Sequence, residues 1–355
     1  MSYPSALPPF APPPSPKIVL LTIDCLPRMA HPRDLPYPLY TLITEGEDTL
    51  DYLVDNLRLP ASSSLPCAGL LTPWGLEVVA VGKKASIGIS ELHQHAALLR
   101  SLAPPPQLRL MVSGSASHCG KTTFTLLLLE SLRKRNLKLG YLKPTTQCEA
   151  ESIVTKYCKA KGVRTKPSSV VFYKGFTRSY ISGTTETSVE MLSSISSDVS
   201  ASFRDCDLVL LDGVGYPSVG SITGCSNADV ALECGAAALI VTPPGVGHAV
   251  DSYGLNAAYF RFGGVDVVGG VVNMCEREGF YSVDACHEWC GRSMKSKGEW
   301  LFGALPKFDS LVGLRDSGDE ELWLKNHLDS VASEFQERVD VDRIVSELER
   351  LERFR

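Results

Sequence analysis

The chain alternates short apolar segments with segments whose apolar residues recur at helical spacing, and the alternation is most regular after residue 106. Short runs that are apolar throughout predict strands buried on both faces, and the helical spacing is clearest at 121–134 and 250–260. This pattern predicts an α/β fold in which a doubly wound, mostly parallel sheet is covered by helices on both faces. The predicted strands are residues 107–113, 137–142, 207–211, 237–242, 265–273 and 301–305.

The first part of the chain follows a different pattern. Residues 1–16 are rich in proline and lack the basic start and apolar stretch of a signal peptide, so we expect a flexible leader. We expect a smaller N-terminal α/β domain, whose role the sequence does not assign, over residues 17–106. Its predicted elements are strands at 17–24 and 76–81 and a helix at 90–102. The proline run at 104–106 ends that helix and marks the domain boundary.

The chain ends in an amphipathic, charge-rich segment at 315–355. Its spacing predicts one or two helices that pack on the domain at 107–314 or on a second subunit. The apolar residues expected on the buried side are Leu322, Leu324, Leu328, Val331, Phe335, Ile344, Leu348 and Leu351.

Composition narrows the choice of partners. Of the 355 residues, 44% are hydrophobic and 21% charged, and the net charge of -5 offers no broad cationic surface for nucleic acid. No apolar run approaches the roughly 20 residues that a membrane span requires. The 11 cysteines form no regular framework. They indicate a reducing compartment, so we expect a cytoplasmic protein.

The strand, turn and helix at 107–134 contain a glycine-rich turn of the kind that binds phosphate. The turn reads Gly, five residues, Gly-Lys-Thr, and Gly120 allows the backbone to approach the phosphates. Lys121 would neutralise the β- and γ-phosphates, and the Thr122 hydroxyl would bind Mg²⁺. The residues that we expect to contact ATP in this turn are Gly114, Ser115, Ala116, Ser117, His118, Cys119, Gly120, Lys121, Thr122 and Thr123.

Two other segments place charged residues where predicted strands end, which in a parallel sheet is the same edge. Asp212 follows an apolar strand in DLVLLDGVG and is a candidate second anchor for the metal. Lys143 in GYLKPTT could hold an anionic acceptor in line with the γ-phosphate. Glu149 follows closely and could contact the metal through water. We therefore expect catalytic roles for Lys121, Lys143 and Asp212, and metal binding by Thr122, Asp212 and Glu149.

Taken together, the loop GSASHCGKTT, the segment KPTT, the turn DGVG and Asn273 in GGVVN resemble dethiobiotin synthetase and the related synthetase domains of cobyrinic and cobyric acid amidation. The resemblance covers about residues 107–314. It implies a homodimeric P-loop enzyme that uses MgATP to phosphorylate a small carboxylate or carbamate substrate, as in biotin biosynthesis. The mixed anhydride then closes a ring or forms an amide.

By motif position, the resemblance implies that Lys121 and Thr122 serve phosphate and Mg²⁺, Lys143 the acceptor and Asp212 the metal. It also implies that Asn273 contacts the adenine. The synthetase normally carries Glu at the position of Asp212, and a shorter acid can still bind a metal.

Two alternatives remain open. One is a non-catalytic ATP-binding regulatory module, like the N-terminal domain of some phosphotransacetylases, because Ala116 replaces an acidic residue of the dethiobiotin loop. The other is a different P-loop kinase or NTPase. GTP is disfavoured because the guanine-reading motif Asn/Thr-Lys-x-Asp is absent where Met274, Cys275 and Glu276 follow Asn273.

Overall fold

The computed structural model describes residues 19–21, 40–43, 67–72, 75–80, 107–147, 150–311, 314 and 318–352, and it describes the first four segments by their backbone alone. Contacts divide the chain into two compact units, one of Met1–Pro105 with Phe354–Arg355 and one of Pro106–Arg353. The predicted leader at 1–16, the predicted helix at 90–102 and Glu149 lie outside the described residues. The N-terminal α/β domain therefore stays a prediction.

The first unit contains a four-stranded sheet in the order β1-β2-β3-β4. The pair β1 and β2 is parallel, whereas β2 with β3 and β3 with β4 are antiparallel. The strands are β1 (Val19–Leu21), β2 (Tyr40–Ile43), β3 (Cys67–Thr72) and β4 (Gly75–Ala80).

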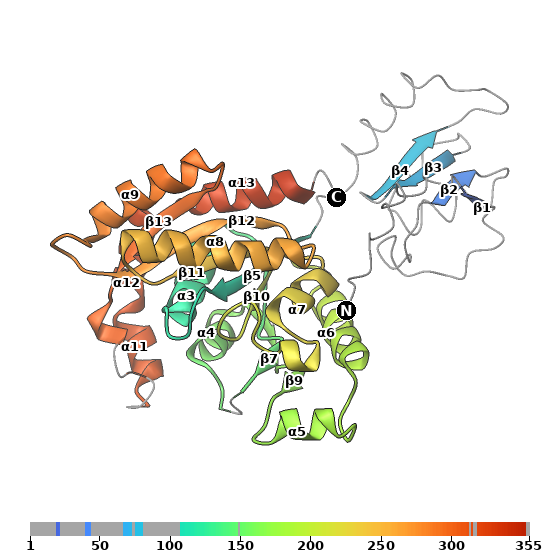
Figure 1. Ribbon diagram of the computed structural model, residues 1–355, viewed down its shortest axis with the longest axis horizontal. Helices are drawn as coiled ribbons and strands as arrows, with labels where there is room; N and C mark the ends of the chain where they lie inside the picture. Colours follow the sequence, from blue (N-terminus) through green and yellow to red (C-terminus); the bar gives the residue numbers. More distant parts are fainter. Residues whose placement is uncertain are drawn as a thin grey trace, which may run out of the picture. The chain divides into compact units, whose positions relative to one another are not determined.

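The second unit is built on a parallel sheet of seven strands in the order β13-β12-β11-β5-β10-β6-β8 (Figure 1). This confirms the doubly wound fold, and all six strands predicted for this unit are present. Within this seven-stranded sheet, the edge strand β8 was not predicted, because it is short and polar. The strands are β5 (Leu108–Gly114), β6 (Leu139–Leu142), β8 (Arg164–Lys166), β10 (Leu208–Asp212), β11 (Ala237–Thr242), β12 (Val267–Cys275) and β13 (Leu301–Pro306).

Helices cover both faces of this sheet, and a second sheet pairs β7 (Thr145–Thr146) with β9 (Val170–Val171). None of the described helices is long and apolar enough to cross a membrane. The described helices are α3 (Lys121–Arg133), α4 (Ile153–Lys161), α5 (Phe176–Ile181), α6 (Ser188–Ser202), α7 (Asn227–Glu233), α8 (Val246–Phe262), α9 (Val283–Ser296), α11 (Glu320–Asn326), α12 (Leu328–Arg338) and α13 (Val341–Glu352), with 3-10 turns η3 (Ser221–Thr223) and η4 (Asp309–Leu311).

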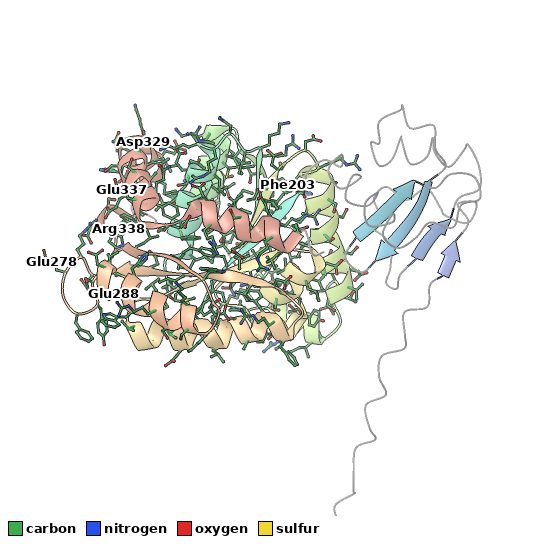
Figure 2. The ribbon with its side chains drawn as sticks, turned by 90° about the horizontal axis from the view of Figure 1, so that it is seen from above. Phe203, Glu278, Glu288, Asp329, Glu337 and Arg338 are labelled. Carbon is green, nitrogen blue, oxygen red and sulfur yellow. The ribbon has the colours of Figure 1, made fainter. Side chains whose placement is uncertain are left out.

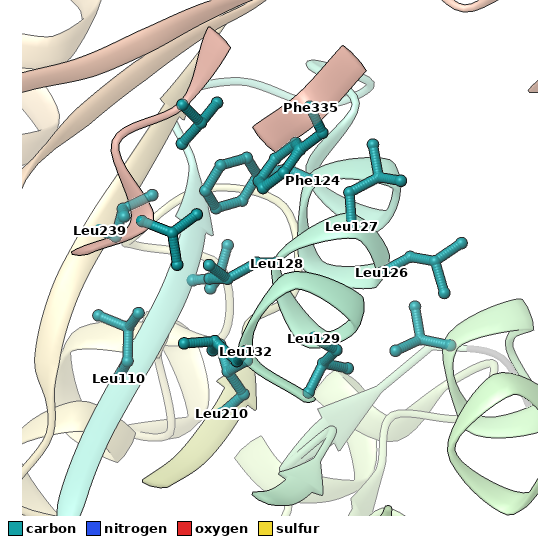
Figure 3. Packing of buried hydrophobic residues seen from close by; sticks show 14 of the residues in the cluster. Leu110, Phe124, Leu126, Leu127, Leu128, Leu129, Leu132, Leu210, Leu239 and Phe335 are labelled. Atoms are coloured by element: carbon teal, nitrogen blue, oxygen red, sulfur yellow. The ribbon is translucent and has the colours of Figure 1, made fainter. Parts of the chain in front are cut away.

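Alternate residues of each strand feed two separate cores, as the two-residue period of a strand requires. On one face, Leu110 and Leu210 pack with α3 and the C-terminal helices, and the rings of Phe124 and Phe335 lie 5.6 Å apart between centroids (Figure 3). On the other face, Met111 packs with residues of α6, α7, α8 and α9. The helix α3, which has the candidate phosphate turn at its start, thus packs between the sheet on one side and the C-terminal helices on the other.

The C-terminal segment forms three described helices where one or two were expected. Leu322 is 58% exposed while its neighbour Trp323 is buried at 4%, so the placement of Leu322 on the buried side is wrong. The helical phase is interrupted at His327, between α11 and α12, and a pattern read as continuous misassigns the residues before the break. Arg338, labelled in Figure 2, lies at the end of α12. It forms an ion pair with Asp284 of α9, which connects this segment to a helix that covers the sheet.

Candidate functional site

The site lies where the central strand β5 passes into α3. On one side β5 pairs with β10, with Asp212 beside Val112, and on the other side it pairs with β11. The chain therefore leaves β5 at its carboxyl end in the middle of the sheet, with one strand on each side. In open α/β sheets, ligands bind in the crevice at such a point, outside the carboxyl ends of the strands.

The base of the turn is anchored to β11 and to the segment that follows β10. The Gly114 N–H donates to the Gly215 carbonyl at 3.0 Å, and the Ser115 N–H donates to the Val241 carbonyl at 2.8 Å. These two N–H groups are therefore engaged by the protein, and contact of Gly114 and Ser115 with ATP stays a prediction. A Cβ on Gly114 would lie 2.6 Å from the Cys119 Sγ, so only glycine fits here. This contact accounts for the glycine at 114 rather than at 115.

The rest of the turn curls over the strand end and leaves donors available. In the described part of the chain, the N–H groups of residues 116–120 donate to no backbone carbonyl. The buried Ser115 hydroxyl likewise has no hydrogen-bond partner there. Ser117, His118 and Thr122 are exposed, so a ligand can reach the turn from solvent. Unpaired donors at a buried strand end fit an anionic ligand such as phosphate.

The start of α3 adds to this preference for an anion. Gly120 precedes the helix with φ 78°, no side chain caps the helix, and its first turn contains no acidic residue. By contrast, α7 begins at the same edge with a Ser226 cap and an acidic Asp229 in its first turn. An uncapped helix start presents free N–H groups and the positive end of the helix dipole.

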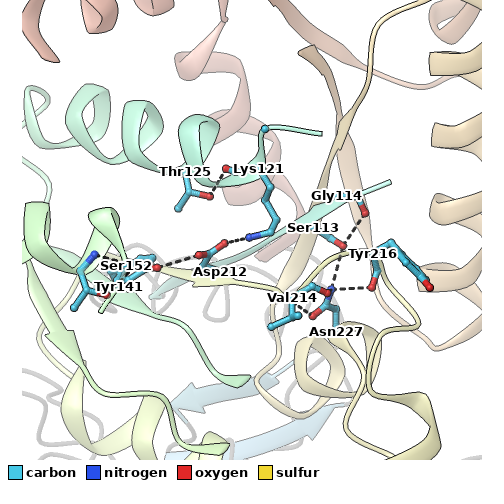
Figure 4. A network of polar contacts seen from close by, with 12 residues as sticks. Ser113, Gly114, Lys121, Thr125, Tyr141, Ser152, Asp212, Val214, Tyr216 and Asn227 are labelled. Carbon is cyan, nitrogen blue, oxygen red and sulfur yellow. Dashed lines mark hydrogen bonds and ion pairs between the residues drawn. The ribbon is translucent and has the colours of Figure 1, made fainter. Parts of the chain in front are cut away.

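Lys121, Asp212 and Tyr141 form a buried polar cluster beside the turn (Figure 4). The Lys121 Nζ forms an ion pair with the Asp212 Oδ1, and the Tyr141 hydroxyl donates to the Asp212 Oδ2 at 3.0 Å. Asp212 is fully buried and the Lys121 side chain is 11% exposed. Sequence reasoning placed Lys121 and Asp212 together but missed Tyr141, whose reach depends on the β6 and β10 register.

The charges around Asp212 keep it ionised. Burial raises the pKa of Asp212, but the positive charges of Lys121 and Lys143 and the hydrogen bonds from Lys121 and Tyr141 outweigh burial, so the pKa lies below its ordinary value. Burial and the Asp212 charge raise the pKa of Tyr141 well above its usual range, so its hydroxyl stays a donor. The half-buried Lys143 thus acts on the same carboxylate as Lys121.

Two asparagines that no sequence pattern singles out hold the turn and the strand before it in place. The Asn227 amide accepts from the Val214 N–H at 2.9 Å and donates to the Ser113 Oγ at 3.3 Å, which joins the segment after Asp212 to the end of β5 (Figure 4). The Asn256 amide of α8 donates to the Ser115 carbonyl at 3.1 Å.

Asn273, the expected adenine contact, lies against the turn itself. Its Nδ2 donates to the Cys119 and Gly120 carbonyls, each at 3.1 Å. A role toward adenine stays a prediction. Of the other expected residues, Thr122 and Thr123 lie in the first turn of α3, which begins at Lys121. Glu151, close in sequence to Glu149, forms an exposed ion pair with Lys159. Among the described residues, no group of three or more His, Cys, Asp or Glu could hold a metal ion.

Comparison with known proteins gives the following matches. A family model described as an AAA domain, AAA_26, matches residues 108–312, and no curated protein matches the sequence. Among solved structures, the signal recognition particle 54 kDa protein from Aeropyrum pernix K1 in complex with GDP is 14% identical, with 68% of this chain and 55% of that chain covered and a TM-score of 0.37. This chain therefore spans about half the length of that protein.

Two further solved structures cover more of their own length. The septum site-determining protein MinD from Pyrococcus horikoshii OT3, complexed with Mg-ADP, is 12% identical over 69% of this chain and 97% of that chain, with a TM-score of 0.40. A nucleotide-binding protein from Archaeoglobus fulgidus in complex with ADP is 17% identical over 61% and 88%, with a TM-score of 0.36.

Proposed function

The chain belongs to the AAA_26 family of AAA domains, and we propose that it is an enzyme that binds MgATP at residues 114–123 and phosphorylates a carboxylate or carbamate acceptor. The observation that carries the proposal is the convergence of Lys121 and Lys143 on the buried carboxylate of Asp212. Two cations beside one acid at the phosphate turn suit a reaction that brings two anions together. Ring closure of the dethiobiotin type is the nearest named reaction.

The nucleotide end of the site follows from the free donors of the turn. The N–H groups of residues 116–120 and the uncapped start of α3 would bind the phosphates, with Lys121 neutralising the terminal ones. The ionised Asp212 and the exposed Thr122 hydroxyl are oxygen donors of the kind that Mg²⁺ prefers. When bound, Mg²⁺ would neutralise charge on the phosphates.

The acceptor end rests on Lys143. It follows β6 and is half-buried. Its positive charge lowers the pKa of Asp212. A cation there would hold an anionic oxygen for attack on the γ-phosphorus, with ADP as the leaving group.

The test is ADP formation measured with and without candidate acceptors, among them a diamino acid with bicarbonate and simple dicarboxylates. We expect turnover only when an acceptor is present. The Lys121→Ala variant should lose nucleotide binding or turnover while staying folded. The Lys143→Ala variant should raise the KM for acceptor more than the KM for ATP. Lys159→Ala removes an exposed lysine outside the site and serves as the matched control.

Two results would contradict the proposal. Unchanged ATP affinity in Lys121→Ala would show that the turn is not the phosphate site. An equal rise in the KM for ATP and the KM for acceptor in Lys143→Ala would show that Lys143 has a structural role.

One observation favours a second candidate, a nucleotide-binding regulatory module without turnover. Both Asp212 oxygens are held by protein groups, Lys121 and Tyr141, and Ala116 stands where the dethiobiotin loop carries an acid. Such a module would bind ATP with negligible ADP formation whichever acceptor is supplied. The same assay therefore separates the two functions.

A further inference from the structure

The end of β12 is distorted where it meets the phosphate turn. Its pairing with β13 shifts register between Val272 and Cys275, and Met274 takes a left-handed φ of 62°. Left-handed conformations are unfavourable for a residue with a side chain and collect at functional positions. Asn273, directly before Met274, is buried at 1% exposure. The distortion thus sits beside a buried polar side chain at the turn.

The Asn273 amide faces two carbonyl groups of the turn. Its Nδ2 donates to the Cys119 and Gly120 oxygens at 3.1 Å each. Carbonyl oxygens only accept hydrogen bonds, so the nitrogen rather than the oxygen of this amide must face them. An Asn amide has two N–H donors, and these two carbonyls use both. Only the Oδ1 of Asn273 therefore remains for another partner.

Holding these carbonyls also aims the donors on the far side of the same peptide planes. In a planar trans peptide, the C=O of one residue and the N–H of the next point in opposite directions. With the Cys119 and Gly120 carbonyls turned to Asn273, the Gly120 and Lys121 N–H groups point away from it. A Cβ on Gly120 would lie 2.2 Å from the Asn273 Nδ2, so the close approach requires glycine there.

We propose that Asn273 is a positioning residue for the phosphate turn, which fixes the Cys119 peptide and, together with the Phe124 N–H, the Gly120 peptide, so that the N–H groups on the far side of these peptides face the phosphates. The part of the nucleotide affinity that Asn273 contributes by positioning the turn acts through the phosphates, so it does not depend on which base the nucleotide carries. Toward a base, Asn273 offers only the acceptor Oδ1, which suits the exocyclic amine of adenine. This inference rests on one part of the proposed function, namely that the turn binds phosphate.

The experiment compares a ligand that has a base with one that has none. Binding of magnesium tripolyphosphate and of MgATP is measured by calorimetry for the wild type, Asn273→Asp and Asn273→Ala. Asp keeps the shape and the acceptor oxygen but replaces both donors by a negative charge that itself repels phosphate, whereas Ala removes the amide and adds no charge. Loss of two hydrogen bonds predicts that tripolyphosphate affinity is weakened about tenfold to a hundredfold in Asn273→Ala. In Asn273→Asp the ratio of the two affinities should stay as in the wild type.

A matched control is Tyr253→Phe, which removes a buried hydrogen bond from Tyr253 to Glu299 outside the turn. Its tripolyphosphate affinity should equal that of the wild type even where its melting temperature falls. If the Asn273 variants fail to fold, Gly120→Ala attacks the same contact from the turn and should weaken tripolyphosphate and ATP by one common factor.

Each outcome decides the matter. Weakened tripolyphosphate binding supports the positioning role, even if no acceptor is ever phosphorylated and the proposed reaction is wrong. Unchanged tripolyphosphate binding with weakened ATP binding makes Asn273 a reader of the base and overturns the proposal. A wild type that binds neither ligand overturns both the positioning role and the proposed function.

Discussion

Replacing Lys121 by methionine is expected to destabilise the protein in the absence of nucleotide. Lys121, which is proposed to act in catalysis, would then also contribute to the stability of the fold. Asp212 would then lie fully buried without its ion-pair partner and would keep the hydrogen bond from the Tyr141 hydroxyl and the electrostatic influence of Lys143. Removing one member of a buried ion pair costs about 3–5 kcal/mol. Because Lys121 keeps 11% exposure and Tyr141 still donates, we expect about 3 kcal/mol, or a fall in melting temperature of roughly 6–12 °C for a unit of this size.

The assay is thermal and urea denaturation without nucleotide, on a double-mutant cycle with Asp212→Asn. Replacing both members removes the unpaired charge, so the double variant should be more stable than Lys121→Met alone. Lys159→Met breaks an exposed ion pair with Glu151 and should change stability by less than about 1 kcal/mol. The reasoning is refuted if Lys121→Met melts with the wild type, or if adding Asp212→Asn recovers nothing.

Three further outcomes follow from the same contacts. Since the folded-state pKa of Asp212 is lowered, its contribution is present above the unfolded pKa of about 3.9 and lost as pH falls through the folded pKa. Asp212→Asn should therefore lose less stability than the wild type between about pH 5 and about pH 3 in urea titrations, and equal losses would contradict this. Tyr141→Phe leaves a buried Asp212 oxygen without a donor and should cost about 1–3 kcal/mol by urea denaturation, and no cost would mean that water replaces the hydroxyl. Phe335→Ala removes the ring packed on Phe124 and should cost about 3–5 kcal/mol by guanidinium denaturation; a cost below 1 kcal/mol would show that α12 does not support α3.

The sheet of the second unit could be predicted because its strands are buried on both faces. A strand such as β11 has only apolar residues and one threonine, all of them buried, and a short apolar run of this kind is typical of a strand in a parallel sheet that is covered on both faces. The edge strand β8 has one covered side and a polar sequence, so no apolar run marks it. The C-terminal helices were misphased for a related reason. Helical periodicity carries information only as far as the helix continues, and His327 ends it.

The candidate site divides in the same way. The turn and Lys121 are contiguous in sequence, and Asp212 ends an apolar strand, so local patterns reveal them. Tyr141 reaches Asp212 because its residue pairs with Leu210 in the β6 and β10 ladder, and that register is a tertiary property. No spacing in the sequence specifies which strand lies beside which.

The shape of the turn depends on residues that are distant in the sequence, so local patterns reveal the turn and not the residues that support it. Its first residues are small and make few contacts of their own, so its shape is imposed by side chains that approach from elsewhere. Asn227 holds Ser113 at the end of β5 from 114 positions away, and Asn256 and Asn273 hold turn residues from 141 and 153 positions away. No sequence pattern singles out Asn227 or Asn256, and the segment GGVVN singles out Asn273 for a contact with adenine rather than with the turn. A phosphate turn can therefore be recognised from its own glycines and lysine, while the residues that determine how well it binds have to be found in three dimensions.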